Sequence, residues 1–173
     1  MNLKNGLTFS EITAEELPLA LEIYNYYIQH STATFRTEAL TLAEFQTFLF
    51  VGHPLYGSYL IRDTALQIHG FCALTRYSPR QAYARTAEIM VYLRPTCTGQ
   101  GVGQWAVKYL EQHAQEHAIR VLIAIVTGEN QASLRLFEKL GYERCAHYKE
   151  VGEIEGRLLD VIAYQKILEQ LLP

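Results

Sequence analysis

Hydrophobic and polar positions along the chain follow two spacings, one typical of strands and the other of helices. Residues 7–12 alternate apolar with polar side chains, which predicts a first strand. The apolar positions that follow recur every three or four residues, as on one face of a helix. Thr13 and Glu16 form the Thr-x-x-Glu pattern of a capping box, so we expect this helix to begin at Thr13 and to end near Gln29.

The same spacings, with the residues that end each segment, predict the remaining elements. Thr41 with Glu44 repeats the capping-box pattern and predicts a short helix over residues 41–50. The apolar run at 121–126 is continuous and rich in β-branched residues, as in a strand buried on both faces. Gly141 is placed to end a helix. The other expected elements are strands over 58–61, 68–77, 84–93, 142–151 and 158–167, the last two paired, and helices over 104–117 and 130–140.

The resulting order of elements is β-α-α-β-β-β-α-β-α-β-β. A chain of this order predicts an α/β (α+β) fold with a mixed, mostly antiparallel central sheet and helices on both faces. The 173 residues contain no linker, internal repeat or low-complexity tract, so we expect residues 1–173 to form a single domain.

Composition and charge exclude several classes of protein. The chain is 49% hydrophobic and 19% charged, which is typical of a soluble globular protein. Its net charge of −3 gives no sign of a nucleic-acid or membrane partner. Residues 1–16 lack the apolar core of a signal peptide, and the aliphatic run at 121–126 is too short to span a membrane. Three cysteines without paired metal spacing predict reduced thiols in a cytoplasmic protein: Cys72, Cys97 and Cys145.

A glycine-rich segment lies between an expected strand and an expected helix. Glycines let successive backbone N–H groups approach a ligand, and the start of a helix adds partial positive charge, so the segment predicts a cradle for a pyrophosphate. A plain flexible turn is the alternative. The residues are Thr98, Gly99, Gln100, Gly101, Val102 and Gly103.

Two nucleotide-binding motifs compete for this segment. Gly101, Gly103 and Ala106 fit the G-x-G-x-x-A dinucleotide pattern, but five residues separate the expected strand from the first glycine, and a dinucleotide loop follows its strand at once. A P-loop is excluded because no Gly-Lys-Ser/Thr follows the glycines.

The segment resembles the first signature of the GNAT superfamily of acetyltransferases, [Gln/Arg]-x-x-G-x-[G/A] before a helix. Thr98 departs from the usual Gln or Arg, which implies weaker rather than absent coenzyme A binding. Residues 130–142, Asn-Gln-Ala-Ser-Leu-Arg-Leu-Phe-Glu-Lys-Leu-Gly-Tyr, resemble the second signature. The resemblance implies the GNAT fold and acetyl-CoA as co-substrate, bound by the loop residues named above together with Met90, Val91, Tyr92, Asn130, Ser133 and Lys139.

Nearly the whole chain resembles one branch of that superfamily, the phosphinothricin acetyltransferases. The resemblance implies acetylation of the α-amine of a small amino acid with a tetrahedral end: phosphinothricin, methionine sulfoximine or methionine sulfone. It also implies a homodimer. Ile154 and Leu158 stand where the branch often has Lys and Trp, so another small amino acid is an open possibility. The resembling segments are Ile23-Tyr24-Asn25-Tyr26-Tyr27, Thr34-Phe35, Arg80-Gln81-Ala82-Tyr83, Thr86-Ala87-Glu88, Val151-Gly152, Gly156-Arg157 and Leu159-Asp160.

Glu88 is the candidate general base. An amine attacks a thioester only as the neutral base, so a group must accept its proton. Glu88 has apolar neighbours on an expected strand, where burial would desolvate the carboxylate, and the resemblance assigns the same role to it. The alternative is a Glu on the solvent face of that strand. Backbone N–H groups near Val91 are candidates to stabilise the oxyanion.

Other roles stay open at this stage. Phe137 stands where the superfamily often has Tyr and the branch His, so the thiolate leaves unassisted or takes a proton from Tyr92, Tyr148 or water. Arg80 is a candidate clamp for the anionic end of the substrate, or else a solvated surface residue. The remaining candidates for substrate contact, with core packing as the alternative for the aromatic ones, are Phe35, Gln81, Ala82 and Tyr83.

Two further functions compete with an acetyltransferase. His113, Glu116 and His117 spell His-x-x-Glu-His, an inverted zinc-peptidase pattern, but there is no third-ligand motif and His113 also falls among apolar positions of its helix. We therefore expect no metal. A regulatory domain that binds acetyl-CoA without turnover is the second alternative, and Thr98 and Phe137 support it.

Overall fold

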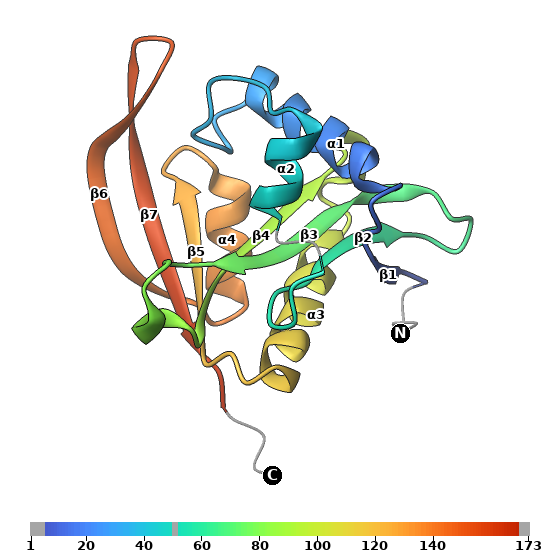
Figure 1. The fold of residues 1–173 in the computed structure, drawn as a ribbon. Coiled ribbons are helices and arrows are strands. Elements are labelled where there is room, and N and C mark those ends of the chain that lie inside the picture. Colours follow the sequence, from blue (N-terminus) through green and yellow to red (C-terminus); the bar gives the residue numbers. More distant parts are fainter. Residues whose placement is uncertain (1–5, 50–51, 170–173) are drawn as a thin grey trace.

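The structure, a computed structural model, describes residues 6–49 and 52–169. Its elements follow the expected order (Figure 1). The strands are β1 (Thr8–Glu11), β2 (Ser58–Arg62), β3 (Ile68–Arg76), β4 (Thr86–Leu93), β5 (Val121–Thr127), β6 (Glu143–Ile154) and β7 (Arg157–Ile167). The helices are α1 (Leu17–His30), α2 (Leu42–Phe48), α3 (Val102–Glu116) and α4 (Gln131–Lys139), with short 3₁₀ turns η1 (Gln81–Tyr83) and η2 (Pro95–Cys97).

The strands form one seven-stranded sheet in the order β1-β2-β3-β4-β5-β7-β6. Neighbouring strands pair antiparallel, except that β4 and β5 are parallel. The sheet is therefore mixed and mostly antiparallel, as predicted, and β6 and β7 form the expected closing pair. The parallel pair lies in the middle of the sheet, where each strand has neighbours on both sides.

Helices cover both faces of the sheet, which confirms the predicted layers (Figure 1). The helices α1 and α2 pack on one face through Leu17, Ala20, Tyr24 and Phe45. The helices α3 and α4 pack on the opposite face through a second apolar cluster. Each of these clusters removes a contiguous apolar surface from water, which is the main stabilising term of the fold. The second cluster includes Ala106, Val107, Leu110, Ala114 and Phe137.

The two Thr-x-x-Glu patterns have different outcomes. Thr41 forms the expected capping box, because its hydroxyl accepts from the Glu44 N–H and the Glu44 side chain accepts from the Thr41 N–H. The predicted start of the first helix at Thr13 is wrong. The N–H of Glu16 donates to the Thr13 carbonyl and closes a separate turn, and α1 begins only at Leu17. Pro18 favours that start, since proline suits the first turn of a helix.

Smaller differences concern boundaries. The helix α3 begins at Val102, so the last two residues of the expected glycine loop are helical. The strand β6 extends to Ile154. Phe50, at the end of the predicted 41–50 helix, lies outside the described residues. The three cysteines are free thiols, as predicted.

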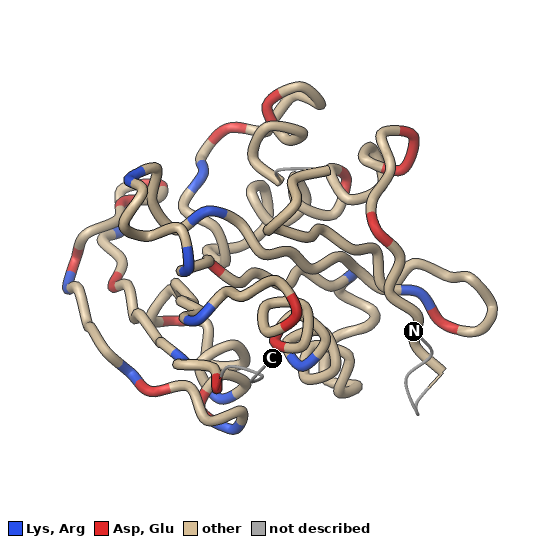
Figure 2. Tube along the Cα trace, turned by 60° about the horizontal axis from the view of Figure 1, so that its bottom comes forward, with Lys and Arg blue, Asp and Glu red and all other residues tan. Residues whose placement is uncertain are grey.

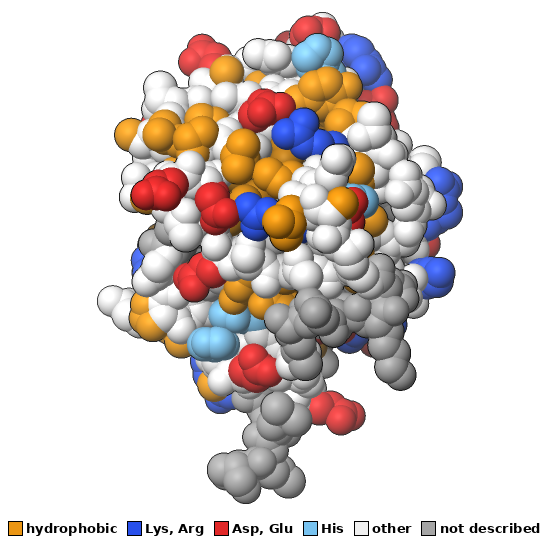
Figure 3. Space-filling model, turned by 90° about the vertical axis from the view of Figure 1, so that its right-hand side faces the viewer, with side chains coloured by type: hydrophobic (Ala, Val, Ile, Leu, Met, Phe, Trp, Pro, Cys, Tyr) orange, Lys and Arg blue, Asp and Glu red, His pale blue; other side chains and the backbone are white. Residues whose placement is uncertain are grey.

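Charges of both signs are dispersed over the molecule. Figure 2 shows Lys and Arg interspersed with Asp and Glu along the trace. The face beside the β1 edge carries hydrophobic, acidic and basic side chains intermixed (Figure 3). No helix within residues 6–49 and 52–169 is long and apolar enough to cross a membrane. Because charges of both signs are interspersed, no general positive field attracts an anionic ligand, and a local arrangement of hydrogen-bond donors must hold it.

The two Thr-x-x-Glu patterns allow a matched test of stability. Replacing Thr41 by Ala removes one bond of a complete capping box and is expected to lower the free energy of unfolding by about 1 kcal/mol. Replacing Thr13 by Ala is expected to cost less than about 0.5 kcal/mol, because that side chain is exposed and caps no helix. Urea unfolding of both variants measures the difference, and equal losses would contradict the distinction.

Candidate active site

The strands β4 and β5 separate in the middle of the sheet. They pair only over Thr86–Glu88 and Val121–Ile123, whereas β3 pairs with β4 as far as Leu93. Beyond Glu88, β4 thus has a partner on one side only, and the two strands diverge in Figure 1. Unpaired backbone groups in the middle of a sheet are costly unless another molecule or a side chain satisfies them. The opening is therefore a candidate binding site.

The register identifies which backbone groups face the opening. The N–H of Arg94 donates to the His69 carbonyl at 2.7 Å, on the β3 side. Because N–H and C=O groups alternate sides along a strand, those of Tyr92 and Met90 also face β3. The N–H groups of Val91 and Leu93 then face the opening. We expected contacts from Met90, Val91 and Tyr92. Of these three residues, only Val91 has an N–H that faces the opening, and Leu93, which was not expected, has the second.

The carbonyl of Leu93 supports this assignment. It accepts a hydrogen bond from the Tyr27 hydroxyl of α1 at 2.6 Å, so it is not part of the β3–β4 ladder. Burial raises the pKa of Tyr27, which therefore remains a donor at ordinary pH. Leu93 was missed from the sequence, although the two-residue period of a strand, applied to the residue before Arg94, would have found it.

The glycine loop follows the open end of β4 after the short turn η2. Gly99 and Gly101 have φ angles of +72° and +82°, and a Cβ added to either would have nothing within 4 Å. Both positions favour glycine for backbone reasons and leave the main chain accessible. Gly101 caps α3, whose first N–H groups have no partner within the helix. This arrangement can bind a pyrophosphate.

The other loop residues have different surroundings. A Cβ on Gly103 would lie 3.3 Å from Cδ2 of Leu136, so this glycine allows α3 and α4 to approach each other. The hydroxyl of Thr98 donates to the Pro95 carbonyl at 2.9 Å, and the Gln100 amide donates to the Thr96 carbonyl at 2.9 Å. Both side chains thus stiffen the loop itself. Val102 is buried at the start of α3.

The second signature segment builds α4. The side chain of Asn130 accepts from the Ser133 N–H at 3.1 Å and caps this helix, while Lys139 is exposed in its last turn. Phe137 is buried, with its ring centroid 5.0 Å from that of Tyr142. Phe137 has no ionisable group and lies in the core, so it cannot protonate a leaving thiolate.

Glu88 lies where β4 and β5 part. Its Cα is paired with those of Thr75 on β3 and Ile123 on β5. Its side chain points to the α1–α2 face, which it shares with Met90 and Tyr92 two and four residues further along. Burial raises the pKa of this carboxyl above its ordinary value, and no opposite charge offsets the effect. A desolvated carboxylate of this kind is a stronger base than one in water.

Tyr92 is poorly suited to be the acid. Its ring packs at right angles to that of Tyr24, with centroids 4.9 Å apart, and its hydroxyl donates to the Ala33 carbonyl at 3.4 Å. Burial raises the pKa of Tyr92 well above its usual range, which makes its proton harder to give up. Tyr148 is 51% exposed on β6, paired with Val161.

The candidate substrate residues lie at the two ends of a strip of the sheet that no helix among the described residues covers, on the face that carries Glu88 and Ile125. Ile125 of β5, on the same face as Glu88, is 39% exposed although its strand is central. The prediction that this strand is buried on both faces fails at this position. The turn η1 precedes β4 at one end, and Phe35, 36% exposed, lies in the loop after α1 at the other. The turn and its cap bring together Arg80, Gln81, Ala82 and Tyr83, which are all exposed.

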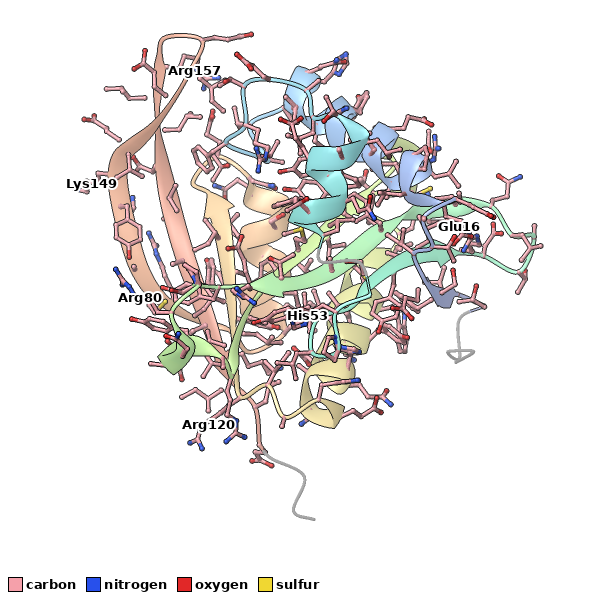
Figure 4. The ribbon with its side chains drawn as sticks, in the orientation of Figure 1. Glu16, His53, Arg80, Arg120, Lys149 and Arg157 are labelled. Carbon is pink, nitrogen blue, oxygen red and sulfur yellow. The ribbon has the colours of Figure 1, made fainter. Side chains whose placement is uncertain are left out.

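Figure 4 shows Arg80 on the β6 side of the molecule, remote from the Glu16 side. Tyr83 packs on Tyr77 with ring centroids 5.6 Å apart. Two hollows of about 350 and 550 Å³ lie elsewhere, the first between α1 and Arg94–Pro95 and the second between α4 and the β6–β7 hairpin. Neither includes Glu88, so the candidate site is defined by the open strand edge and the carboxylate.

The sequence model of the "Acetyltransferase (GNAT) family" matches residues 20–142, which is more than half of the chain and includes β4, the glycine loop and α4. The chain belongs to this family. It is therefore an N-acetyltransferase, and its mixed sheet is the GNAT fold.

Characterised relatives specify the branch. The chain is 30% identical over 158 residues to phosphinothricin N-acetyltransferase of Streptomyces coelicolor, covering 89% of this chain and 92% of that protein. It is 28% identical to the L-methionine sulfoximine/L-methionine sulfone acetyltransferase of Pseudomonas aeruginosa, with 89% and 90% covered. A GNAT phosphinothricin acetyltransferase from Sinorhizobium meliloti, solved with AcCoA, superposes with a TM-score of 0.86 at 26% identity, covering 94% of this chain and 89% of that one.

The histidine pair does not resemble a zinc site. The ring nitrogens of His113 lie 2.8 Å from the Tyr59 hydroxyl and 3.3 Å from the Leu55 carbonyl oxygen, so both are engaged. The Nδ1 atom of His117 lies 2.8 Å from the His113 carbonyl, and the two rings stack. Within the described ranges, no three His, Cys, Asp or Glu residues are grouped to hold a metal ion. In this GNAT protein His113 fastens α3 to β2 through Tyr59 and to the segment before β2 through Leu55.

Two glycines of the loop provide a matched test of coenzyme binding. Alanine at position 101 is expected to disfavour the left-handed conformation by about 1–2 kcal/mol, and so to weaken coenzyme A binding by roughly 5- to 30-fold. Alanine at position 103 meets only the flexible end of Leu136 and is expected to change binding less than about threefold. Calorimetric titration with coenzyme A compares them; a larger effect at position 103 would contradict the distinction.

Proposed function

We propose that the protein transfers the acetyl group of acetyl-CoA to the α-amine of a small amino acid or analogue, with Glu88 as general base. The observation that carries the proposal is the desolvated Glu88 carboxylate at the point where β4 loses its β5 partner. An acyl donor held along the open edge would lie next to this base. Phosphinothricin, methionine sulfoximine and methionine sulfone are the substrate class we infer from the names of the relatives.

The open edge of β4 and the glycine loop fit successive parts of acetyl-CoA. The N–H group of Leu93 suits an amide oxygen of a pantetheine arm, which would continue the interrupted sheet, and the N–H of Val91 is left for the thioester end. The left-handed glycines and the start of α3 suit the pyrophosphate. Asn130, Ser133 and Lys139 are proposed to contact the more distant part of the coenzyme. No metal is needed in this scheme.

The reaction follows from these positions. The substrate ammonium gives one proton to Glu88, directly or through water, and the neutral amine attacks the thioester carbonyl. A C–N bond forms, and the carbonyl oxygen becomes an oxyanion that the Val91 N–H can stabilise. Collapse breaks the C–S bond, and the second nitrogen proton reaches the thiolate. Because a thiol has a pKa of only about 8.5, water or the exposed Tyr148 suffices for this transfer, and the buried Tyr92 is not required.

The substrate side is proposed to be built by η1 and by the loop after α1. Arg80 is exposed and would bind the anionic or sulfonyl end of the amino acid, since guanidinium matches such oxygens. Phe35, Tyr83 and the aromatic ring of Tyr92 would contact its apolar stem, with Gln81 and Ala82 beside them. Ile154 and Leu158 depart from the branch pattern, so we propose a screen of amino acids and of their oxidised and phosphinate analogues.

Three further expectations remain proposals. We propose that residues 1–173 act as a single domain, that the protein is a cytoplasmic homodimer, and that it binds neither nucleic acid nor membrane. The dimer is implied by the resemblance to the branch, and sedimentation velocity measures it directly.

A second candidate function is an acetyl-CoA sensor without turnover, which the departures at Thr98 and Phe137 favour. It predicts coenzyme binding with no thiol release in the presence of any amine. Thiol release from acetyl-CoA with methionine sulfone or phosphinothricin would reject it.

Replacement of Glu88 by Gln tests the base. The turnover number is expected to fall by about two to four orders of magnitude. The unaltered enzyme needs ionised Glu88, so its kcat/KM should fall as the pH is lowered through the raised pKa of this group. This acid limb should disappear in E88Q, whose residual rate should rise steadily with pH as free amine accumulates. Unchanged rates and an unchanged pH profile would reject Glu88 as the base.

A further inference from the structure

The β6–β7 hairpin contains a bulge opposite Asp160. Tyr148 pairs with Val161, and the next pair is Gly152 with Leu159. Three residues, 149–151, therefore stand against Asp160 alone. Glu150, inside this bulge, has a φ of +56°, a left-handed conformation that a residue other than glycine rarely adopts. Lys149, in the bulge, and Arg157, near the hairpin turn, are labelled in Figure 4.

Asp160 holds the bulge in place from the opposite strand. One carboxylate oxygen accepts from the Glu150 N–H at 2.9 Å, and the other lies 2.6 Å from Nε2 of His147. These hydrogen bonds from His147 and from the Glu150 amide hold the pKa of Asp160 below its ordinary value, so the carboxylate stays ionised. The Asp160 carbonyl also accepts from the Gly128 N–H at 2.8 Å, which ties the hairpin to the end of β5.

The bulge ends at a glycine that touches the loop after α1. A Cβ on Gly152 would lie 2.4 Å from Cε1 and 2.5 Å from Cδ1 of Phe35. The backbone of Gly152 is not left-handed, so the Phe35 ring, and not the local conformation, is what requires glycine here. Figure 1 shows this part of the hairpin beside the loop that follows α1.

The loop that carries Phe35 is anchored at two residues just before the ring. The Thr127 hydroxyl donates to the Thr32 carbonyl, and the hydroxyls of Tyr24 and Thr34 lie 3.0 Å apart in a hydrogen bond. Neither anchor involves Gly152. Pressure on Phe35 from the hairpin can therefore be relieved by rotation of its ring, which is partly exposed.

We propose that the contact between Gly152 and Phe35 determines how long an amino acid the site accepts, with Asp160 and His147 as positioning residues for the bulge. The inference rests on the proposed function. Phe35 forms an apolar wall at the end of the strip that begins at Glu88. Because Gly152 has no side chain, the Phe35 ring can lie against the hairpin and away from the substrate. Any side chain at position 152 moves the ring toward the substrate and shortens the site. A smaller side chain at position 35 lengthens it.

The test measures kcat/KM over amines of increasing length, from glycine and alanine to methionine sulfone, and the KM for acetyl-CoA. In the variant G152A, kcat/KM for methionine sulfone is expected to fall about tenfold or more, and kcat/KM for the shorter amines is expected to fall less. Its KM for acetyl-CoA should stay within about twofold of the value for the unaltered enzyme. In the double variant F35L/G152A, kcat/KM for methionine sulfone is expected to return to within about threefold of the value for the unaltered enzyme. D160N is expected to show a smaller loss in the same direction.

Val151→Ala is the matched control, because Val151 lies in the same bulge and is 59% exposed; it should leave the length preference unchanged. Equal losses for short and long amines in G152A, or no rescue by Phe35→Leu, would overturn the inference while leaving the proposed function intact. If G152A fails to fold, F35L alone tests the point, since it should accept longer amines than the unaltered enzyme does. No transfer to any amine by the unaltered protein would reject the proposed function and this inference with it.

Discussion

The structure depends on an interruption of hydrogen bonding in the middle of its sheet. The parallel pairing of β4 with β5 stops at Glu88, while β4 continues for five residues against β3 alone. An unpaired strand edge in a protein interior is unfavourable, and elsewhere in the described sheet the ladders are continuous apart from bulges. Here the helices α1 and α3 pack on opposite faces of the sheet beside β4. The buried carboxyl group of Glu88 precedes this half-paired segment, and the glycine loop follows it in the chain.

The general architecture could be predicted from the sequence because it depends on local patterns. Alternation and helical spacing predict the strands and helices in the correct order. The capping box at Thr41, whose side-chain hydrogen bonds are present in the structure, predicts the start of its helix to within a residue. The same signal at Thr13 fails because a proline five residues later offers a better start, and because the Glu16 carboxylate divides its two oxygens between Thr13 at 3.3 Å and Arg62 of β2 at 2.6 Å. Competition between local signals is decided by tertiary contacts.

The candidate site could be predicted only in outline. Glu88 and the loop glycines could be identified from the sequence, because a single residue type or a single spacing indicates each of them. Leu93 was not found, since its contribution comes from the main chain and depends on strand register. The difference between Gly101 and Gly103 depends on where Leu136 lies, and the need for glycine at position 152 depends on an aromatic ring more than a hundred positions away in sequence. Such contacts between distant segments leave no periodic trace in a single sequence.

The bond from Tyr27 to the Leu93 carbonyl gives the open edge a direction. At Val91 the edge presents both a donor and an acceptor, but at Leu93 the acceptor is already occupied and only the donor remains. A ligand with amides in series would therefore meet an N–H donor at both residues, but a carbonyl without an intramolecular partner only at Val91. A phenol on a neighbouring helix thus makes the open edge asymmetric, because one of the two carbonyl groups that face the opening is already engaged within the protein.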